Sequence, residues 1–217
     1  MAKKLTKGLF ITFEGPEGCG KSTHSSRIAE ELKGAGYDVL RTLEPGGTEL
    51  GKRIREVLLI KEDIPLEGGA EFLLFEADRA QHVREVILPA VEEGKVVICD
   101  RFNTSTFAYQ GYGLGMDMDM VFAVDDVSTG GLKPDLTVLL DVDAATGLER
   151  AGKAGTADRM EKRDLAFHEK VRAGFLDLAE KDPARVKVVE VRDDIEETYA
   201  LVKELVDGLI ERYKGTE

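Results

Sequence analysis

Short runs of apolar residues alternate along the chain with longer stretches in which apolar residues recur every three or four positions. The short runs, such as LFITF and LTVLLD, are rich in β-branched residues and nearly continuous in hydrophobicity. Strands of a parallel sheet that helices cover on both faces have this pattern. We therefore predict five strands, at residues 8–14, 37–42, 95–100, 135–141 and 186–191.

The longer stretches predict helices on the faces of that sheet. In one of them, Ile54, Val57 and Leu58 fall on a single helical stripe. The alternation of strand and helix patterns predicts an α/β fold, with a five-stranded parallel sheet and helices on both faces. We predict helices over residues 21–33, 48–60, 71–91, 161–181 and 195–213.

The composition of the chain excludes several classes of protein and function. The chain has 217 residues, with 42% hydrophobic and 33% charged, which predicts a single domain over residues 1–217. The net charge of −12 argues against a surface for a nucleic acid polymer. We see neither a signal peptide nor an apolar run of the roughly 20 residues that span a bilayer. Cys19 and Cys99 are too few for a disulfide framework, which favours a cytoplasmic location.

A glycine-rich loop follows the first predicted strand and precedes the first predicted helix. It matches G-x-x-x-x-G-K-[ST], a loop whose backbone N–H groups bind the phosphates of a nucleoside triphosphate. In this motif Lys21 reaches the β- and γ-phosphates, and the hydroxyl of Ser22 ligates Mg²⁺. The predicted ATP-binding residues are Gly15, Pro16, Glu17, Gly18, Cys19, Gly20, Lys21, Ser22 and Thr23.

The third predicted strand ends with Asp100 and Arg101. The carboxyl ends of parallel strands line the ligand crevice, so Asp100 is expected near the phosphate loop, where it can hold Mg²⁺ through water. Arg101 offers a forked donor that suits a phosphate. The alternative is that the two residues form a structural ion pair. No N-K-x-D sequence follows a later strand, which argues against a GTPase and leaves a small kinase.

Several motifs together resemble bacterial thymidylate kinases. They are FEGPEGCGKST, EPGGT at 44–48, LLFEADRAQHV at 73–83, DRFNTSTFAYQG at 100–111 and the charged stretch 147–179. The resemblance is collinear over about residues 8–210. It implies a P-loop NTPase fold, a homodimer, ATP and dTMP as substrates, and Mg²⁺ as the cofactor.

The resemblance also implies roles for individual residues. Phe75 matches the ring that stacks on thymine, and Arg79, on the same helix face at i+4, matches the arginine at the base edge. For Phe75 the alternative is simple core packing. Glu17 matches an acidic residue near the attacking phosphate. The residues that match other contacts to dTMP are Arg101 at its phosphate, Ser105, Thr106 and Gln110 along the nucleotide, and Tyr109 at the sugar 2′ position.

Two departures from the family pattern concern positive charge. Leu43 stands where the family often has an arginine, and Gly18 leaves the phosphate loop without one. Members of this kind use an arginine from a lid, which we place at about residues 146–162, but Ala154 occupies the matching position. The lid stretch could equally be a solvated loop and helix end. The cations left to contact the transferred phosphate are Arg150, Lys153 and Arg159.

The sequence therefore predicts transfer of the γ-phosphate of ATP to dTMP, giving dTDP. Lys21, Glu17, Arg101 and the lid cations are the expected catalytic residues, while Ser22 and Asp100 are the expected metal ligands. One alternative is a kinase of dUMP, CMP or AMP. Another is a nucleotide-dependent switch without an acceptor site.

Overall fold

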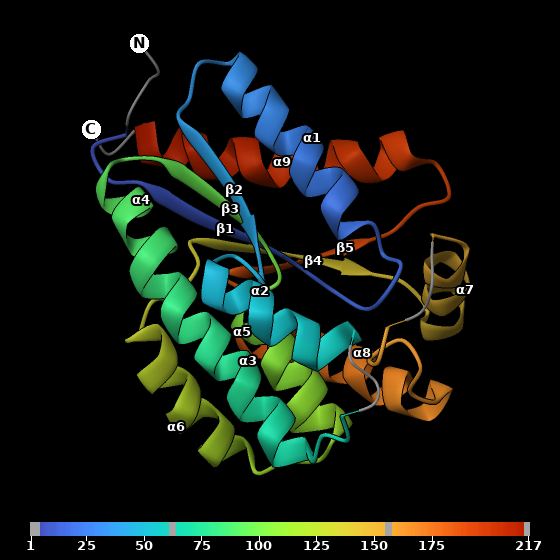
Figure 1. Ribbon diagram of the computed structural model, residues 1–217. Helices are drawn as coiled ribbons and strands as arrows, with labels where there is room; N and C mark the ends of the chain where they lie inside the picture. The colour runs from blue at the N-terminus through green and yellow to red at the C-terminus, as the bar shows by residue number, and fades with distance from the viewer. Residues whose placement is uncertain (1–4, 61–63, 155–157, 215–217) are drawn as a thin grey trace.

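The five predicted strands are confirmed as one parallel sheet in the computed structural model, which describes residues 5–60, 64–154 and 158–214. The sheet consists of β1 (Leu9–Glu14), β2 (Val39–Leu43), β3 (Val96–Asp100), β4 (Leu136–Asp141) and β5 (Val186–Glu190). Their spatial order is β2-β3-β1-β4-β5, so β1 lies at the centre of the sheet (Figure 1). Ile11 of β1 lies beside Ile98 of β3 and Leu136 of β4, which places the carboxyl ends of all three strands at one edge.

Two helices cover one face of the sheet. They are α1 (Lys21–Gly34) and α9 (Ile195–Lys214), which lie together above the strands in Figure 1. Apolar side chains of both helices, such as Ile28 and Val206, pack with Leu9, Ile11 and Val138 of the strands. Every residue of β1 is buried, as expected for a central strand that is covered on both faces.

The remaining helices cover the opposite face and the carboxyl edge of the sheet (Figure 1). Here Phe10, Val97 and Cys99 pack against one group of helical residues, and Leu139 packs against another. The elements are α2 (Glu49–Arg55), η1 (Glu56–Ile60), α3 (Gly68–His82), η2 (Val83–Ile87), α4 (Leu88–Glu92), α5 (Asn103–Thr106), η3 (Phe107–Gly113), α6 (Met118–Thr129), α7 (Ala144–Ala154) and α8 (Leu165–Lys181), where η marks a π-helical stretch.

The helical segment between β3 and β4 is absent from the sequence-based prediction. In the structure, α5 and η3 continue directly from the strand, and α6 follows with Asp117 as its N-cap. The sequence of α6 carries β-branched, serine and threonine residues of low helix propensity. Its apolar Val121 is nevertheless fully buried, so tertiary packing rather than propensity determines this helix.

The predicted helix boundaries need one further correction. The helix expected over residues 161–181 begins at Leu165, because the side chain of Asp164 accepts a hydrogen bond from Phe167 N and caps it there. The stretch predicted as a lid, or alternatively as a solvated loop and helix end, is helical up to Ala154, where α7 ends. Residues 155–157 of the predicted lid lie outside the described residues. Among the helices of the described ranges, none is both long and apolar enough to cross a membrane.

Candidate functional site

A cavity of about 450 Å³ lies at the carboxyl edge of the sheet. The phosphate loop, the start of α1 and the residues that follow β2 and β3 line one part of it. Residues of α2, η1, α3, α5, η3 and α7 and the stretch 158–161 line the rest. Most predicted site residues lie on its wall. They are Glu17, Gly18, Gly20, Lys21, Ser22, Thr23, Phe75, Arg79, Arg101, Ser105, Thr106, Tyr109, Gln110 and Arg150.

Three glycines of the phosphate loop, Gly15, Gly18 and Gly20, have a positive φ, a backbone conformation that favours glycine. Gly15 has a φ of 135°, and a Cβ there would lie 2.2 Å from Leu140 O. Gly20 has a φ of 92° and precedes the first turn of α1, whose residues Lys21, Ser22 and Thr23 line the cavity. Lys21 Nζ folds back on the loop and donates to Gly15 O at 3.0 Å and Pro16 O at 2.7 Å. Cys19 is buried behind it, with Sγ at 3.4 Å from that ammonium.

Arg101 crosses from β3 to the phosphate loop. Among the described residues it is the one non-glycine with a positive φ, 68°, a conformation that costs energy and that concentrates at functional sites. This turn sends the guanidinium back over the loop, where Nη2 lies 2.9 Å from both carboxylate oxygens of Glu17. Nη1 donates to Ser105 Oγ at 3.0 Å, and Nη2 lies 3.3 Å from the hydroxyl of Tyr109.

The charge on Glu17 is fixed by these neighbours. Burial alone would raise the pKa of Glu17, but the charges of Arg101 and Lys21 and a 2.6 Å hydrogen bond from the Tyr109 hydroxyl lower it to about 2. Burial would lower the pKa of Arg101, yet Glu17 raises it well above its ordinary value. Both members of the pair are therefore charged at neutral pH.

A second buried carboxylate, Glu14, holds the turn that carries Arg101. Its Oε1 accepts from Phe102 N at 2.8 Å, and its Oε2 accepts from Ser105 Oγ at 2.5 Å. Burial raises the pKa of Glu14 in spite of these hydrogen bonds and the charge of Arg101. Ser105 therefore links Glu14 to Arg101, a positioning contact that the sequence motif does not reveal.

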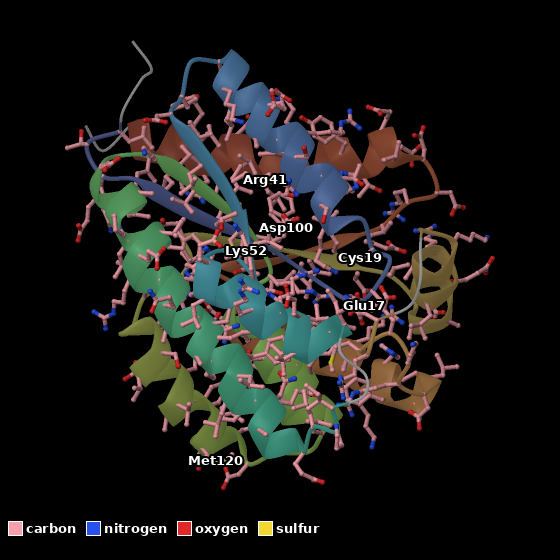
Figure 2. All side chains as sticks on the ribbon, in the orientation of Figure 1. Glu17, Cys19, Arg41, Lys52, Asp100 and Met120 are labelled. Carbon is pink, nitrogen blue, oxygen red and sulfur yellow. The ribbon has the colours of Figure 1, made fainter. Side chains whose placement is uncertain are left out.

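Asp100 is linked to the start of α1 through Arg41, whose Nη2 also lies 3.3 Å from Ser22 O. Its Oδ2 accepts from Arg41 Nη2 at 2.7 Å, and Arg41 also donates to Ser25 Oγ at 3.1 Å. Figure 2 shows Arg41 and Asp100 close together above the site, with Glu17 on the loop nearby. The Oδ1 atom of Asp100 is buried and has no partner among the described residues, so it is the oxygen left for a cation or its water.

The base end of the cavity is formed by α3. Phe75 is half-buried against the apolar cluster that includes Tyr109, so it both packs and faces the cavity. Arg79 is 2% exposed, and its Nε donates to Glu44 Oε2 at 2.9 Å while its Nη1 donates to Thr106 Oγ1 at 2.8 Å. Glu76 also pairs with Nη1. Nη2 donates to no described residue and remains for a ligand.

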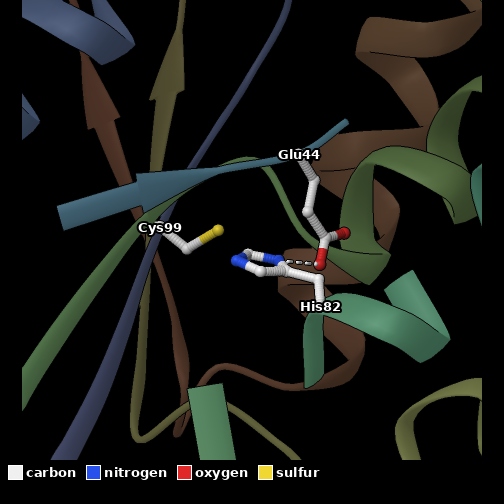
Figure 3. A group of neighbouring side chains, drawn as sticks. All are labelled: Glu44, His82 and Cys99. Atoms are coloured by element: carbon white, nitrogen blue, oxygen red, sulfur yellow. Dashed lines mark hydrogen bonds and ion pairs between the residues drawn. The ribbon is translucent and has the colours of Figure 1, made fainter. Parts of the chain in front are cut away.

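A histidine holds Glu44 in place behind Arg79. His82 is fully buried, with Nδ1 at 2.9 Å from Glu44 Oε1 and Nε2 at 2.7 Å from Thr42 Oγ1. Figure 3 shows the imidazole between Glu44 and Cys99. These three groups could in principle bind a metal ion, but both ring nitrogens are already engaged. Burial also raises the pKa of the Cys99 thiol well above its ordinary value, which disfavours the thiolate that a metal needs.

Two further aspartates surround Arg79. Asp78 Oδ1 accepts from Gly46 N at 3.0 Å and so holds the turn after Glu44. Burial and the nearby charge of Glu44 raise the pKa of Asp78 to about 6. Burial also raises the pKa of Asp125 to about 6, although Arg79 opposes the shift. The single buried guanidinium is thus surrounded by more carboxyl groups than it can neutralise.

Gln110 lies on η3 at the same end of the cavity. Its Nε2 donates to Glu71 Oε1 at 3.0 Å, and Glu71 Oε2 accepts from Arg163 Nη2 at 2.7 Å. Both Gln110 and Glu71 are buried. The amide therefore has a fixed partner on α3.

The lid cations occupy different positions. Arg150 of α7 lines the cavity and lies 3.5 Å from Asp193. Lys153, on the same helix, pairs with Glu149 at 2.6 Å on the exposed surface and does not line the cavity. Arg159 lies beyond the three undescribed residues, with its backbone N at 3.4 Å from Leu59 O. The structure thus separates the three candidates that the sequence leaves equal.

The sequence-based list omits several residues of the site. Glu44, Asp78 and His82 fix Arg79 and its surroundings, and Glu71 fixes Gln110. Their signal is present in the pattern, because polar residues interrupt the buried stripe of α3 at helical spacing. Such polar residues must find buried hydrogen-bond partners. The polar residues that interrupt the stripe are Glu71, Asp78, His82 and the already predicted Arg79.

Comparisons with known proteins agree on one family. The family model described as thymidylate kinase matches residues 13–202. A thymidylate kinase of Deinococcus radiodurans is 50% identical over 204 residues, with 92% of this chain and 98% of that protein covered. One of Pseudomonas fluorescens is 46% identical, with 96% and 99% covered. The crystal structure of thymidylate kinase from Ehrlichia chaffeensis has a TM-score of 0.76 and 35% identity, covering 92% of this chain and 98% of that one.

Proposed function

The chain belongs to the thymidylate kinase family and phosphorylates dTMP with ATP, and we propose how its own residues divide that work. The observation that carries the proposal is the joint placement of the phosphate loop, Arg101 and the Phe75–Arg79 face around one cavity. The loop binds the donor phosphates, Arg101 binds the acceptor phosphate, and α3 binds the base. The alternative of a switch without an acceptor site has no such support.

The donor end holds the triphosphate of ATP. The N-terminus of α1 and the loop N–H groups bind its phosphates, and Lys21 leaves the carbonyls of Gly15 and Pro16 for the β- and γ-phosphate oxygens. Ser22 and Asp100 hold Mg²⁺, which neutralises charge on the phosphates when it is bound. The unpartnered Oδ1 of Asp100 fits this role, because a buried carboxylate oxygen without a donor favours a cation or its water.

The acceptor end holds dTMP. Phe75 stacks on the thymine, and the free Nη2 of Arg79 donates to its edge. Gln110 contacts the base, and Tyr109 stands against the sugar. Thr106 positions Arg79, because its Oγ1 accepts a hydrogen bond from Arg79 Nη1 at 2.8 Å. In the same way, Ser105 Oγ accepts a hydrogen bond from Arg101 and positions it.

Catalysis consists mainly of positioning and charge neutralisation, since the acceptor phosphate is already a nucleophile. Arg101 grips this phosphate while Glu17 holds the guanidinium from behind, at 2.9 Å. Because the pKa of Glu17 is about 2, it acts as a fixed anion that orients Arg101 and not as a base. The segment 146–162 is the lid of this single kinase domain, and Arg150 is the lid cation already on the cavity wall.

A homodimer is part of the proposal. Large apolar side chains are exposed on α2, α3 and α6, three helices that pack side by side. Figure 2 shows Met120 at the outer end of this surface. An apolar surface over adjacent helices is typical of an interface between subunits. Its members are Leu50, Leu73, Met120, Phe122 and Val127.

The acceptor specificity can be tested directly. ADP release from ATP is followed in a coupled assay with dTMP, dUMP, UMP, CMP, AMP and GMP as acceptors. We expect the highest kcat/KM for dTMP and a further loss for each ribonucleotide, because Tyr109 stands at the sugar. A clear preference for another monophosphate would overturn the proposed acceptor site and leave the fold unaffected.

A further inference from the structure

The buried Glu71 and the partly exposed Arg163 form an ion pair behind the base end of the cavity that phosphoryl transfer itself does not require. Glu71 has no exposed surface, and its two oxygens have different partners. Oε1 accepts from Gln110 Nε2 at 3.0 Å, and Oε2 accepts from Arg163 Nη2 at 2.7 Å. Gln110 lies on the cavity wall, whereas Glu71 and Arg163 do not. The pair therefore acts on a ligand only through Gln110.

The carboxylate of Glu71 fixes the orientation of the Gln110 side-chain amide. A carboxylate that is ion-paired to an arginine can only accept hydrogen bonds, so it selects the NH₂ group of the amide and rejects its oxygen. A flip of the amide would place Oε1 against Glu71 Oε1, two acceptors at hydrogen-bond distance in a buried position. Oε1 of Gln110 accepts from none of the described residues, so it remains with the second N–H for the cavity.

This orientation matches one class of pyrimidine edge. Thymine and uracil present an N3–H donor beside carbonyl acceptors, and an amide with a free oxygen and one free N–H pairs with both. Cytosine presents an unprotonated N3 and an NH₂ group, so the same amide would place acceptor against acceptor and donor against donor. We propose that Glu71, held by Arg163, is a positioning residue that fixes the Gln110 amide and makes the site select thymine and uracil over cytosine. This inference rests on the proposed contact between Gln110 and the base.

The test compares acceptors in Glu71→Gln, which keeps the size of the side chain but can both donate and accept. The amide of Gln110 is then free to flip, and we expect the ratio of kcat/KM for dTMP to that for dCMP to fall about 10-fold or more. The ratio for dTMP to dUMP should not change, because both bases present the same N3–H edge. Affinities for dTMP and dCMP from calorimetry should shift in the same way as the kinetic ratio.

A matched control removes a comparable ion pair elsewhere. Asp141→Asn weakens the bidentate pair between Asp141 and Arg172, at 2.7 and 2.8 Å, and should leave both ratios unchanged. If Glu71→Gln lowers kcat/KM for all three acceptors equally, Glu71 only supports the fold and the inference is wrong. If Glu71→Gln does not fold, Arg163→Gln loosens the same carboxylate from a partly exposed position and should lower the dTMP to dCMP ratio in the same direction; an unchanged ratio would equally refute the inference.

Gln110→Met separates this inference from the proposed site. If Gln110 contacts the base, Gln110→Met weakens dTMP binding, and Glu71→Gln added to it has no further effect on the ratio. Normal dTMP affinity in Gln110→Met would show that the proposed base contact is wrong. Weakened affinity in Gln110→Met together with an unchanged ratio in Glu71→Gln would overturn the role of Glu71 alone.

Discussion

Asp78 provides a test of the electrostatics around Arg79. Its carboxyl is buried next to Glu44, which raises its pKa from the ordinary 3.8 to about 6, while His82 and Arg79 oppose the shift. The folded chain therefore binds this proton more tightly than the unfolded chain. Between about pH 4 and pH 6 the folded state holds more protons, so the free energy of unfolding falls as the pH rises through this range.

The size of the effect follows from the two pKa values. A carboxyl with a pKa of about 6 when folded and about 4 when unfolded destabilises the fold by about 3 kcal/mol above pH 6. Asp78→Asn removes this destabilisation, because the amide is neutral at every pH. Its oxygen can still accept the hydrogen bond from Gly46 N, which Asp78 Oδ1 now accepts at 3.0 Å.

Urea unfolding at pH 4.5, 5.5, 6.5 and 7.5 measures the prediction. The wild-type free energy of unfolding should decline across this series by about 2 kcal/mol more than that of Asp78→Asn. Asp126→Asn removes the same formal charge from an exposed position on α6 and serves as the control, with a pH dependence like that of the wild type. Parallel pH profiles for Asp78→Asn and the wild type would refute the assignment of a buried carboxyl with a raised pKa at this position.

Four other predictions concern the site and the assembly. Lys21→Ala should lower kcat by several orders of magnitude with an unchanged Tm, and near-normal activity would contradict the mechanism. Arg150→Ala should lower kcat about 10-fold or more, while Lys153→Ala on the same helix should stay within about 2-fold, as measured in the coupled assay. His82→Ala should destabilise the fold by about 2 kcal/mol and raise the KM for dTMP, because Glu44 and Thr42 lose their buried partner; an unchanged KM would disconnect His82 from the base site. Leu73→Glu should convert a dimer to a monomer in light scattering, whereas Leu165→Glu, equally a charge on an exposed leucine but on α8, should not.

The sheet and the phosphate loop follow from local sequence, which is why both were predictable. Each strand is a near-continuous apolar run, and the glycines of the loop are required by its backbone, as at Gly15. By contrast, α6 was not predicted, because its residues have low helix propensity and the helix depends on tertiary packing. The start of α8 shifted to Leu165 because one side chain, that of Asp164, caps it. The sequence alone does not show which residue in a run of charged residues caps a helix.

The candidate site divides in the same way. Residues that line the cavity and belong to a motif or match the family pattern, such as Lys21 and Phe75, could be named from the sequence. Residues that hold those side chains could not, because Glu71 and His82 act across 39 and 38 positions of sequence, respectively. Such pairings depend on how α3 packs against η3 and on where the chain leaves β2. They become visible only when the elements are placed together.

The cations of the site have partners within the protein, so a bound phosphate has to compete with those partners. Lys21 is held by loop carbonyls, Arg101 by Glu17, and Arg41 by Asp100. Because Glu17 stays ionised down to about pH 2, a phosphate near Arg101 must share the guanidinium with an anion. A single phosphate beside Arg101 therefore gains little at this end of the cavity, whereas a bound triphosphate is also attracted by Lys21 and Arg150. We therefore expect the strongest grip on the acceptor phosphate in the complex that holds both substrates.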